Sequence, residues 1–185
     1  MTRLGSSILI RAPIEKVFAR VAQHDRCADW LEFVSSASYT SEQRVGTGTS
    51  AYHTGQIMGR KMGWEGIVVE WVESERVVWQ ASSGEPEKMR MKALNWVKRE
   101  DGGTRYGLEV EYVLPYPLLG KLMDILMVKR VVARSIQKSL ERLRTVVEEE
   151  SSRLQDSIED RQRASTGSLI RPLSHRYPEY VSSRE

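Results

Sequence analysis

The sequence predicts an α+β fold in which a curved antiparallel β-sheet of about six or seven strands wraps around one long C-terminal helix. Residues 35–114 are rich in Val, Thr, Tyr and Trp and contain closely spaced turn sequences, such as Asp101-Gly102-Gly103. Short strands with close turns are typical of an antiparallel meander. Two short helical segments precede this region, and a helical apolar period follows it.

The N-terminal part is expected to hold one strand and two short helices. Residues 7–11 begin the chain with a short strand pattern. Pro13 suits the first turn of a helix, because its missing N–H has no partner there, and this helix should end near His24. The second helix is expected at residues 29–33, with three apolar side chains facing inward: Trp30, Leu31 and Phe33.

The last strand has the clearest pattern. From Tyr106 to Leu114 apolar side chains alternate with mostly polar ones, so one face of the sheet should be buried and the other wet. Asp101-Gly102-Gly103 should join this strand to the preceding one as a hairpin, because glycine accepts positive φ angles.

After Pro117 the apolar period becomes helical and runs to Val147, which predicts a helix of roughly 30 residues. The stripe fades from Ser151 onward. We therefore expect one domain over residues 1–150 and a polar C-terminal extension, 151–185, that is disordered when the protein is alone.

Composition excludes several classes. The 185-residue chain has a net charge of +3 without a basic block, so nucleic acid is not an expected partner. No apolar run approaches the roughly 20 residues of a membrane span. Cys27 is the single cysteine, which fits a reducing, cytoplasmic location. The histidines at 24, 53 and 175 are scattered along the chain, so we expect no metal site, and no cofactor is predicted.

Several segments, in order, resemble the START-like (SRPBCC) superfamily, and in particular its polyketide cyclase/dehydrase and lipid-transport families. The resemblance covers about residues 5–147 and rests on five segments: 10–18, 28–31 (Ala-Asp-Trp-Leu), 45–48 (Val-Gly-Thr-Gly), 64–79 and 102–105 (Gly-Gly-Thr-Arg). It implies a helix-grip fold. Function does not follow from it, because this fold serves cyclases, lipid carriers, chaperones and receptors.

A curved sheet that grips its helix at one end leaves a gap at the other, and such apolar gaps are typical small-molecule sites. Each expected lining residue either touches a ligand or fills the core. For Trp64 and Trp79 the inward parity is open, because both parities of their strands are apolar. The expected set is Tyr52, Trp64, Val68, Trp79, Met89, Met91, Asn95, Tyr106, Leu108, Val110, Tyr112, Leu122, Leu126 and Lys129.

Lys129 falls in the middle of the apolar helical stripe. A cation there should find a carboxylate, reach water, or meet an anionic ligand group.

We expect the protein to bind or carry a hydrophobic small molecule, such as a lipid, quinone, pigment or polyketide-like compound. One alternative is an aromatase/cyclase acting on a poly-ketone-like chain. The residues that would carry its proton transfers are Tyr52, His53, Asn95, Tyr106 and Lys129.

A further alternative is an accessory subunit of a larger complex, docked through its tail at 165–185. The helical segment 118–133 is apolar nearly all round and also carries cations, so it is expected to contact a protein partner or, peripherally, a membrane.

Overall fold

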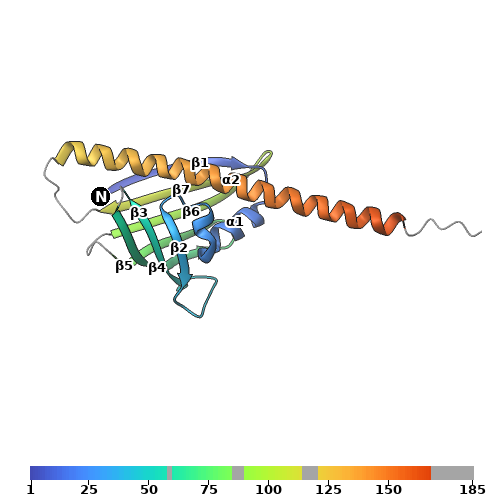
Figure 1. Ribbon diagram of the computed structural model, residues 1–185, viewed down its shortest axis with the longest axis horizontal. Helices are drawn as coiled ribbons and strands as arrows, with labels where there is room; N and C mark the ends of the chain where they lie inside the picture. The colour runs from blue at the N-terminus through green and yellow to red at the C-terminus, as the bar shows by residue number, and fades with distance from the viewer. Residues whose placement is uncertain (58–59, 85–89, 114–120, 168–185) are drawn as a thin grey trace, which may run out of the picture. The chain divides into compact units, whose positions relative to one another are not determined.

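The computed structural model describes residues 1–57, 60–84, 90–113 and 121–167 (Figure 1). The chain divides into two compact units, Met1–Ser151 and Ser152–Glu185. In chain order the elements are β1 (Thr2–Ile10), α1 (Ile14–Ala22), the 3-10 helix η1 (His24–Asp29), β2 (Val34–Tyr39), β3 (Ser50–Ile57), β4 (Arg60–Val72), β5 (Arg76–Gly84), β6 (Arg90–Glu100), β7 (Gly103–Val113) and α2 (Lys121–Gly167).

The strands form one seven-stranded sheet in the order β1-β7-β6-β5-β4-β3-β2, and every neighbouring pair is antiparallel. Apart from the contact that joins β1 to β7, the order follows the chain, as in a meander. This sheet, the two short N-terminal helices and the long C-terminal helix confirm the predicted helix-grip α+β fold.

The hairpin between β6 and β7 lies where it was predicted. Gly102 has a φ of 83° and Gly103 a φ of 153°. A side chain at Gly103 would also meet the Ile10 carbonyl oxygen, 2.1 Å from an added Cβ. Glycine is therefore needed both for the turn and for the close approach of the chain after β1.

The core lies between the sheet and the part of α2 that ends at Ser151. Ile136, Leu140 and Leu143 are at most 1% exposed and pack in one cluster with Tyr106 and Leu108 of β7. The alternation predicted for β7 is therefore confirmed, and the helical stripe supplies the matching apolar surface.

Polar contacts fix the register of α2 against the N-terminal segments. The buried guanidinium of Arg20, on α1, lies 2.6 Å from Asp29 and 3.7 Å from Glu150 of α2. Further along the helix, Glu32 accepts from Lys138 at 3.1 Å, and its backbone N–H donates to Ser139 Oγ at 2.9 Å. Because such contacts need defined geometry, they select one position of the helix along the sheet.

The second short helix differs from the prediction. It is η1, it ends at Asp29, and residues 30–33 follow it as a non-helical link. The N–H groups of Trp30 and Leu31 both donate to the carbonyl oxygen of Cys27, at 3.2 and 2.8 Å. These bonds turn the chain so that the apolar side chains of residues 30–33 still face inward. The predicted burial of these side chains is therefore correct, although the helix lies earlier in the chain than predicted.

The long helix also differs: α2 has 47 residues and continues past Ser151 to Gly167. Side chains 152–158 are all exposed. Residues 152–158 lack an apolar stripe but also lack Gly and Pro, and their Arg, Gln and Leu residues favour helix locally. The expected disorder of 151–185 thus does not apply to residues 151–167, and residues 168–185 lie outside the described residues. Within the described part of the chain, no helix is long and apolar enough to span a membrane.

Two leucines of α2 provide a matched test of this packing. Leu143 is 0% exposed and Leu154 is 50% exposed. We expect Leu143→Ala to lower the free energy of unfolding by about 2–5 kcal/mol, since it opens a cavity in the core. Leu154→Ala should change it by less than about 0.5 kcal/mol. Urea unfolding followed by circular dichroism measures both, and equal losses would contradict the packing described here.

Candidate ligand-binding site

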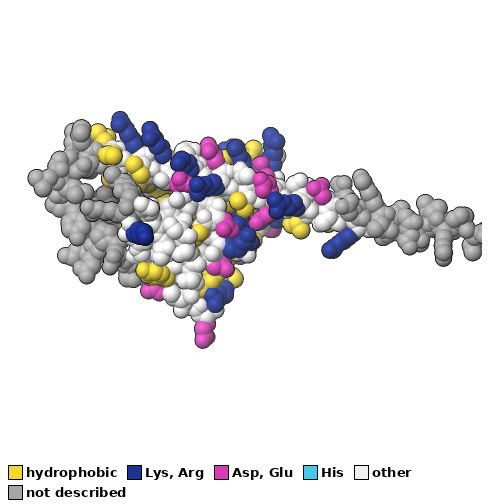
Figure 2. All heavy atoms as spheres, viewed as in Figure 1, with side chains coloured by type: hydrophobic (Ala, Val, Ile, Leu, Met, Phe, Trp, Pro, Cys, Tyr) yellow, Lys and Arg dark blue, Asp and Glu magenta, His cyan; other side chains and the backbone are white. Residues whose placement is uncertain are grey.

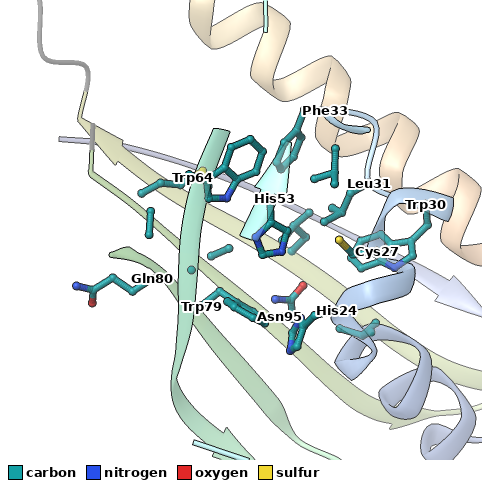
Figure 3. A pocket seen from close by; sticks show the side chains of 17 residues that line it. His24, Cys27, Trp30, Leu31, Phe33, His53, Trp64, Trp79, Gln80 and Asn95 are labelled. Carbon is teal, nitrogen blue, oxygen red and sulfur yellow. The ribbon is translucent and has the colours of Figure 1, made fainter. Parts of the chain in front are cut away.

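A cavity of about 60 Å³ lies between the N-terminal helices and the concave face of strands β3 to β7 (Figure 3). Its wall is apolar and aromatic with a few polar groups. The lining residues are Val21, His24, Cys27, Trp30, Leu31, Phe33, Val34, His53, Trp64, Gly66, Trp79, Gln80, Ala81, Met91, Ala93, Asn95 and Leu108.

The strands place their side chains by parity. On β3, Ala51 and His53 are buried and face the cavity side, whereas Tyr52 between them is exposed. On β4, Trp64 and Val68 share the buried face. Successive side chains of a strand point to opposite faces. The burial of Trp64 beside Val68 therefore shows which face of β4 is turned inward, a choice that the sequence leaves open.

Four aromatic rings form the centre of the site. His53 stacks on Trp64 with centroids 5.5 Å apart and an interplanar angle of 7°. Trp79 meets two histidines edge to face, His24 at 3.6 Å and His53 at 5.5 Å. Aromatic pairs of this kind are worth about 0.5–1.5 kcal/mol beyond burial, so the cluster holds the rings in defined orientations.

Both histidines are buried and uncharged. His24 is 3% exposed and His53 is 6% exposed. Burial lowers the pKa of His24 to about 2, and the charge of a protonated His53 adds to the effect. Burial also lowers the pKa of His53 to about 4, against the opposing effect of a backbone hydrogen bond at Ala51. At neutral pH the site therefore holds two neutral imidazoles.

Each imidazole has one nitrogen without a partner among the described residues: Nε2 of His24 and Nδ1 of His53. The indole Nε1 of Trp30, also on the cavity wall, has none either. An unsatisfied buried polar group costs about 1–3 kcal/mol. The site thus keeps hydrogen-bonding capacity that a bound molecule or water would satisfy.

Asn95 adds a fixed amide to the wall. The hydroxyl of Tyr106 donates to Asn95 Oδ1 at 2.8 Å, and Asn95 Nδ2 lies 3.5 Å from the Val77 carbonyl oxygen, which is a long contact. Complete burial raises the pKa of Tyr106 well above its ordinary value, so its hydroxyl stays a donor. The amide group of Asn95 is consequently left with donor capacity inside the cavity.

Only some of the residues expected to line the cavity do line it. Five members line the cavity: Trp64, Trp79, Met91, Asn95 and Leu108. Four others are buried in the core outside this lining: Val68, Tyr106, Val110 and Tyr112. Lys129 is half-exposed and does not line the cavity, and none of the described residues forms an ion pair with it. Met89 lies outside the described residues, as does the side chain of Leu122.

Tyr52 and Leu126 require correction as cavity residues. Tyr52 is 46% exposed on the outer face of β3, where Gly63 leaves room for its hydroxyl, 2.1 Å from a Cβ added there. Leu126 is 49% exposed. Val128, two residues further along α2, packs against the core, and two residues of an α-helix turn by about 200°, so Leu126 points to nearly the opposite side.

Sequence reasoning missed the contributions of the N-terminal helices, above all His24 and Cys27. The available indication was the inward pattern at Trp30, which predicted burial but not membership of the site. Burial raises the pKa of the Cys27 thiol to about 12, and Asp25 and Asp29 nearby contribute to this. Cys27 is therefore a protonated, unreactive wall residue at neutral pH.

Among the described residues, no group of three or more His, Cys, Asp or Glu side chains is placed to hold a metal ion.

Comparisons with known proteins agree with this fold. Residues 1–148 match the family model described as polyketide cyclase / dehydrase and lipid transport. A comparison with curated protein sequences finds no significant match.

Solved structures share the fold. A protein from Thermus thermophilus is 22% identical with a TM-score of 0.70, and the match covers 81% of this chain and 99% of that one. The Zhui aromatase/cyclase of a Streptomyces species is 15% identical with a TM-score of 0.66, covering 80% and 93%. A START superfamily protein from Mycobacterium smegmatis is 12% identical with a TM-score of 0.60, covering 82% and 98%.

The two histidines predict an acid-sensitive fold. The unfolded chain binds protons on His24 and His53 near pH 6.5, whereas the folded chain binds them only near their lowered pKa values. Stability should therefore fall as the pH drops below about 6.5, by about 2 kcal/mol per histidine at pH 5. Urea unfolding at pH 7.5 and pH 5 measures the difference, and His24→Gln or His53→Gln should each remove about 2 kcal/mol of it. A double variant that keeps the full difference would show that other groups cause it.

Proposed function

Because the chain belongs to the polyketide cyclase/dehydrase and lipid transport family, we propose that its cavity binds a small, uncharged, mostly apolar molecule that carries a hydrogen-bonding group. A phenol, a quinone or a polyketide-like ring compound has this chemistry. The observation that carries the proposal is the pair of buried neutral histidines, whose free nitrogens lie in an aromatic wall.

The charge of the lining defines the ligand class. None of the cavity's described lining residues carries a formal charge at neutral pH, since both histidines are neutral. A carboxylate or phosphate placed here would lose its hydration without gaining a counter-ion, which is costly. The site therefore favours neutral quinone-like or phenol-like ligands over ionised fatty acids.

The size of the cavity implies that its wall adapts to a ligand. About 60 Å³ accommodates a few water molecules, whereas ligand pockets commonly measure about 300–1,000 Å³. Met91 and Leu31 are half-buried members of the wall. Methionine changes rotamer at low cost and fills irregular spaces, so Met91 is the side chain of the wall most suited to move aside.

The alternative of a cyclase is less well supported by the histidines. A general base works best with a pKa near the operating pH, and the pKa values of His24 and His53 are about 2 and about 4. In the present environment these imidazoles donate or accept hydrogen bonds but do not take up a second proton at pH 7. They therefore serve recognition better than proton transfer.

Docking of an accessory subunit through residues 165–185 stays a prediction, since 168–185 lie outside the described residues.

A displacement assay tests the ligand class. We expect a fluorescent apolar probe such as N-phenyl-1-naphthylamine to bind the native protein at micromolar strength. Menadione, a neutral quinone, should displace it at least about tenfold more effectively than palmitate at pH 7.5, because the wall offers no counter-ion. A probe that binds only once unfolding begins would mean that the interior is solid, and preferential displacement by palmitate would contradict the proposed ligand chemistry.

A paired substitution on β3 tests the role of the imidazole. His53→Phe keeps a ring to stack on Trp64 and removes the free nitrogen. We expect it to weaken binding of 2-naphthol about tenfold while binding of naphthalene stays unchanged, since one buried hydrogen bond is lost. Tyr52→Phe, which removes a hydroxyl from the outer face of the same strand, is the control and should alter neither. Calorimetric titration of the two ligands gives the comparison, and equal losses for both would point to a packing effect instead.

A further inference from the structure

The first described turns of α2 expose apolar side chains next to cations. Leu126 is 49% exposed and Met127 is 55% exposed. They precede Arg130 and Arg134, which are also exposed. Large exposed apolar side chains are ordinary one at a time, but an adjacent pair on a helix flanked by cations indicates an interaction surface.

Helix geometry places these side chains on one face. Leu126, Arg130 and Arg134 are spaced by four residues and so follow one another along the same side. Met127 lies three residues before Arg130 and seven before Arg134, which puts it next to that row. Figure 2 shows yellow and dark blue side chains adjoining along this part of α2. We call Leu126, Met127, Arg130 and Arg134 the basic-apolar face.

The charges of this region are all of one sign. Residues 126–140 contain four cations and no Asp or Glu. Lys138 is paired with Glu32, whereas no described residue forms an ion pair with Lys129, Arg130 or Arg134. Their charge is available to an external anionic partner.

The opposite side of the same turns is anchored in the domain. Val128 and Val132 pack against the main core cluster. An external partner can therefore occupy the basic-apolar face without displacing a core side chain.

We propose that the basic-apolar face docks the protein peripherally on an anionic lipid bilayer. The arginines approach the lipid phosphates, and Leu126 and Met127 enter the boundary between headgroups and acyl chains. A second copy of this chain is the less suitable occupant, because a symmetric contact through this face would bring the unpaired arginines of both copies together. This surface is separate from the cavity, since none of its residues lines the cavity.

Sedimentation with vesicles tests the proposal with the full-length protein. We expect binding to vesicles containing phosphatidylglycerol and phosphatidylcholine, little binding to pure phosphatidylcholine, and a decrease as salt rises. The double variant Arg130→Gln/Arg134→Gln should weaken binding about 25-fold, or about fivefold for each cation removed near the surface. Leu126→Ser/Met127→Ser should weaken it about tenfold at constant charge.

The matched control is Lys61→Gln/Lys98→Gln, which removes two exposed cations elsewhere on the sheet and should change vesicle binding by less than about threefold. Thermal melting verifies that all variants fold. Equal loss in the control and the arginine variant would overturn the proposal, because it would show that net charge alone drives binding. A concentration-dependent dimer that disappears in Leu126→Ser/Met127→Ser, with wild-type protein that ignores anionic vesicles, would also overturn it in favour of a second copy as the occupant.

Discussion

The rest of the structure depends on the packing of α2, up to Ser151, into the concave face of the sheet. Ile136, Leu140, Leu143 and Val147 are at most 2% exposed, so this part of the concave face is completely filled. No described α2 residue lines the cavity. The helix therefore takes up one part of the concave face, and η1 with its following link closes over another. The cavity exists because α2 and the η1 segment cover the same face of the sheet and leave a gap between the η1 segment and the strands.

The polar groups of the site are held in place by their burial. Aromatic rings bury much of His24 and His53, and this burial keeps both imidazoles neutral. Tyr106 acts in a similar way on Asn95, since a buried phenol that cannot ionise must donate its proton in a hydrogen bond. Desolvation thus sets the protonation state and the orientation of the groups at once, and the uncharged character of the cavity follows from it.

The fold could be predicted from local patterns, and the site could be predicted only in part. The alternation of β7, the Asp101-Gly102-Gly103 turn and the stripe through Leu140 are each visible within one segment. Site membership instead depends on which parity of β4 and β5 faces inward, and the pairing of these two strands shifts its register between Glu65 and Gly66 and again between Val68 and Glu70, which a repeating pattern within one strand does not reveal. It also depends on η1, whose i to i+3 turns have no apolar period. The pairing of His24 with Trp79, far apart in sequence, arises only once the sheet has curved.

The reactivity of the single cysteine, Cys27, reports how often the cavity wall opens. Cys27 is 3% exposed, and its pKa is raised to about 12, so its thiol is shielded both from contact and from ionisation. A maleimide or disulfide reagent can reach it only in the moments when η1 and the link after it move away from the sheet. The rate of alkylation in unmodified protein therefore measures how often the wall parts, and a molecule seated inside would slow that rate in proportion to its occupancy.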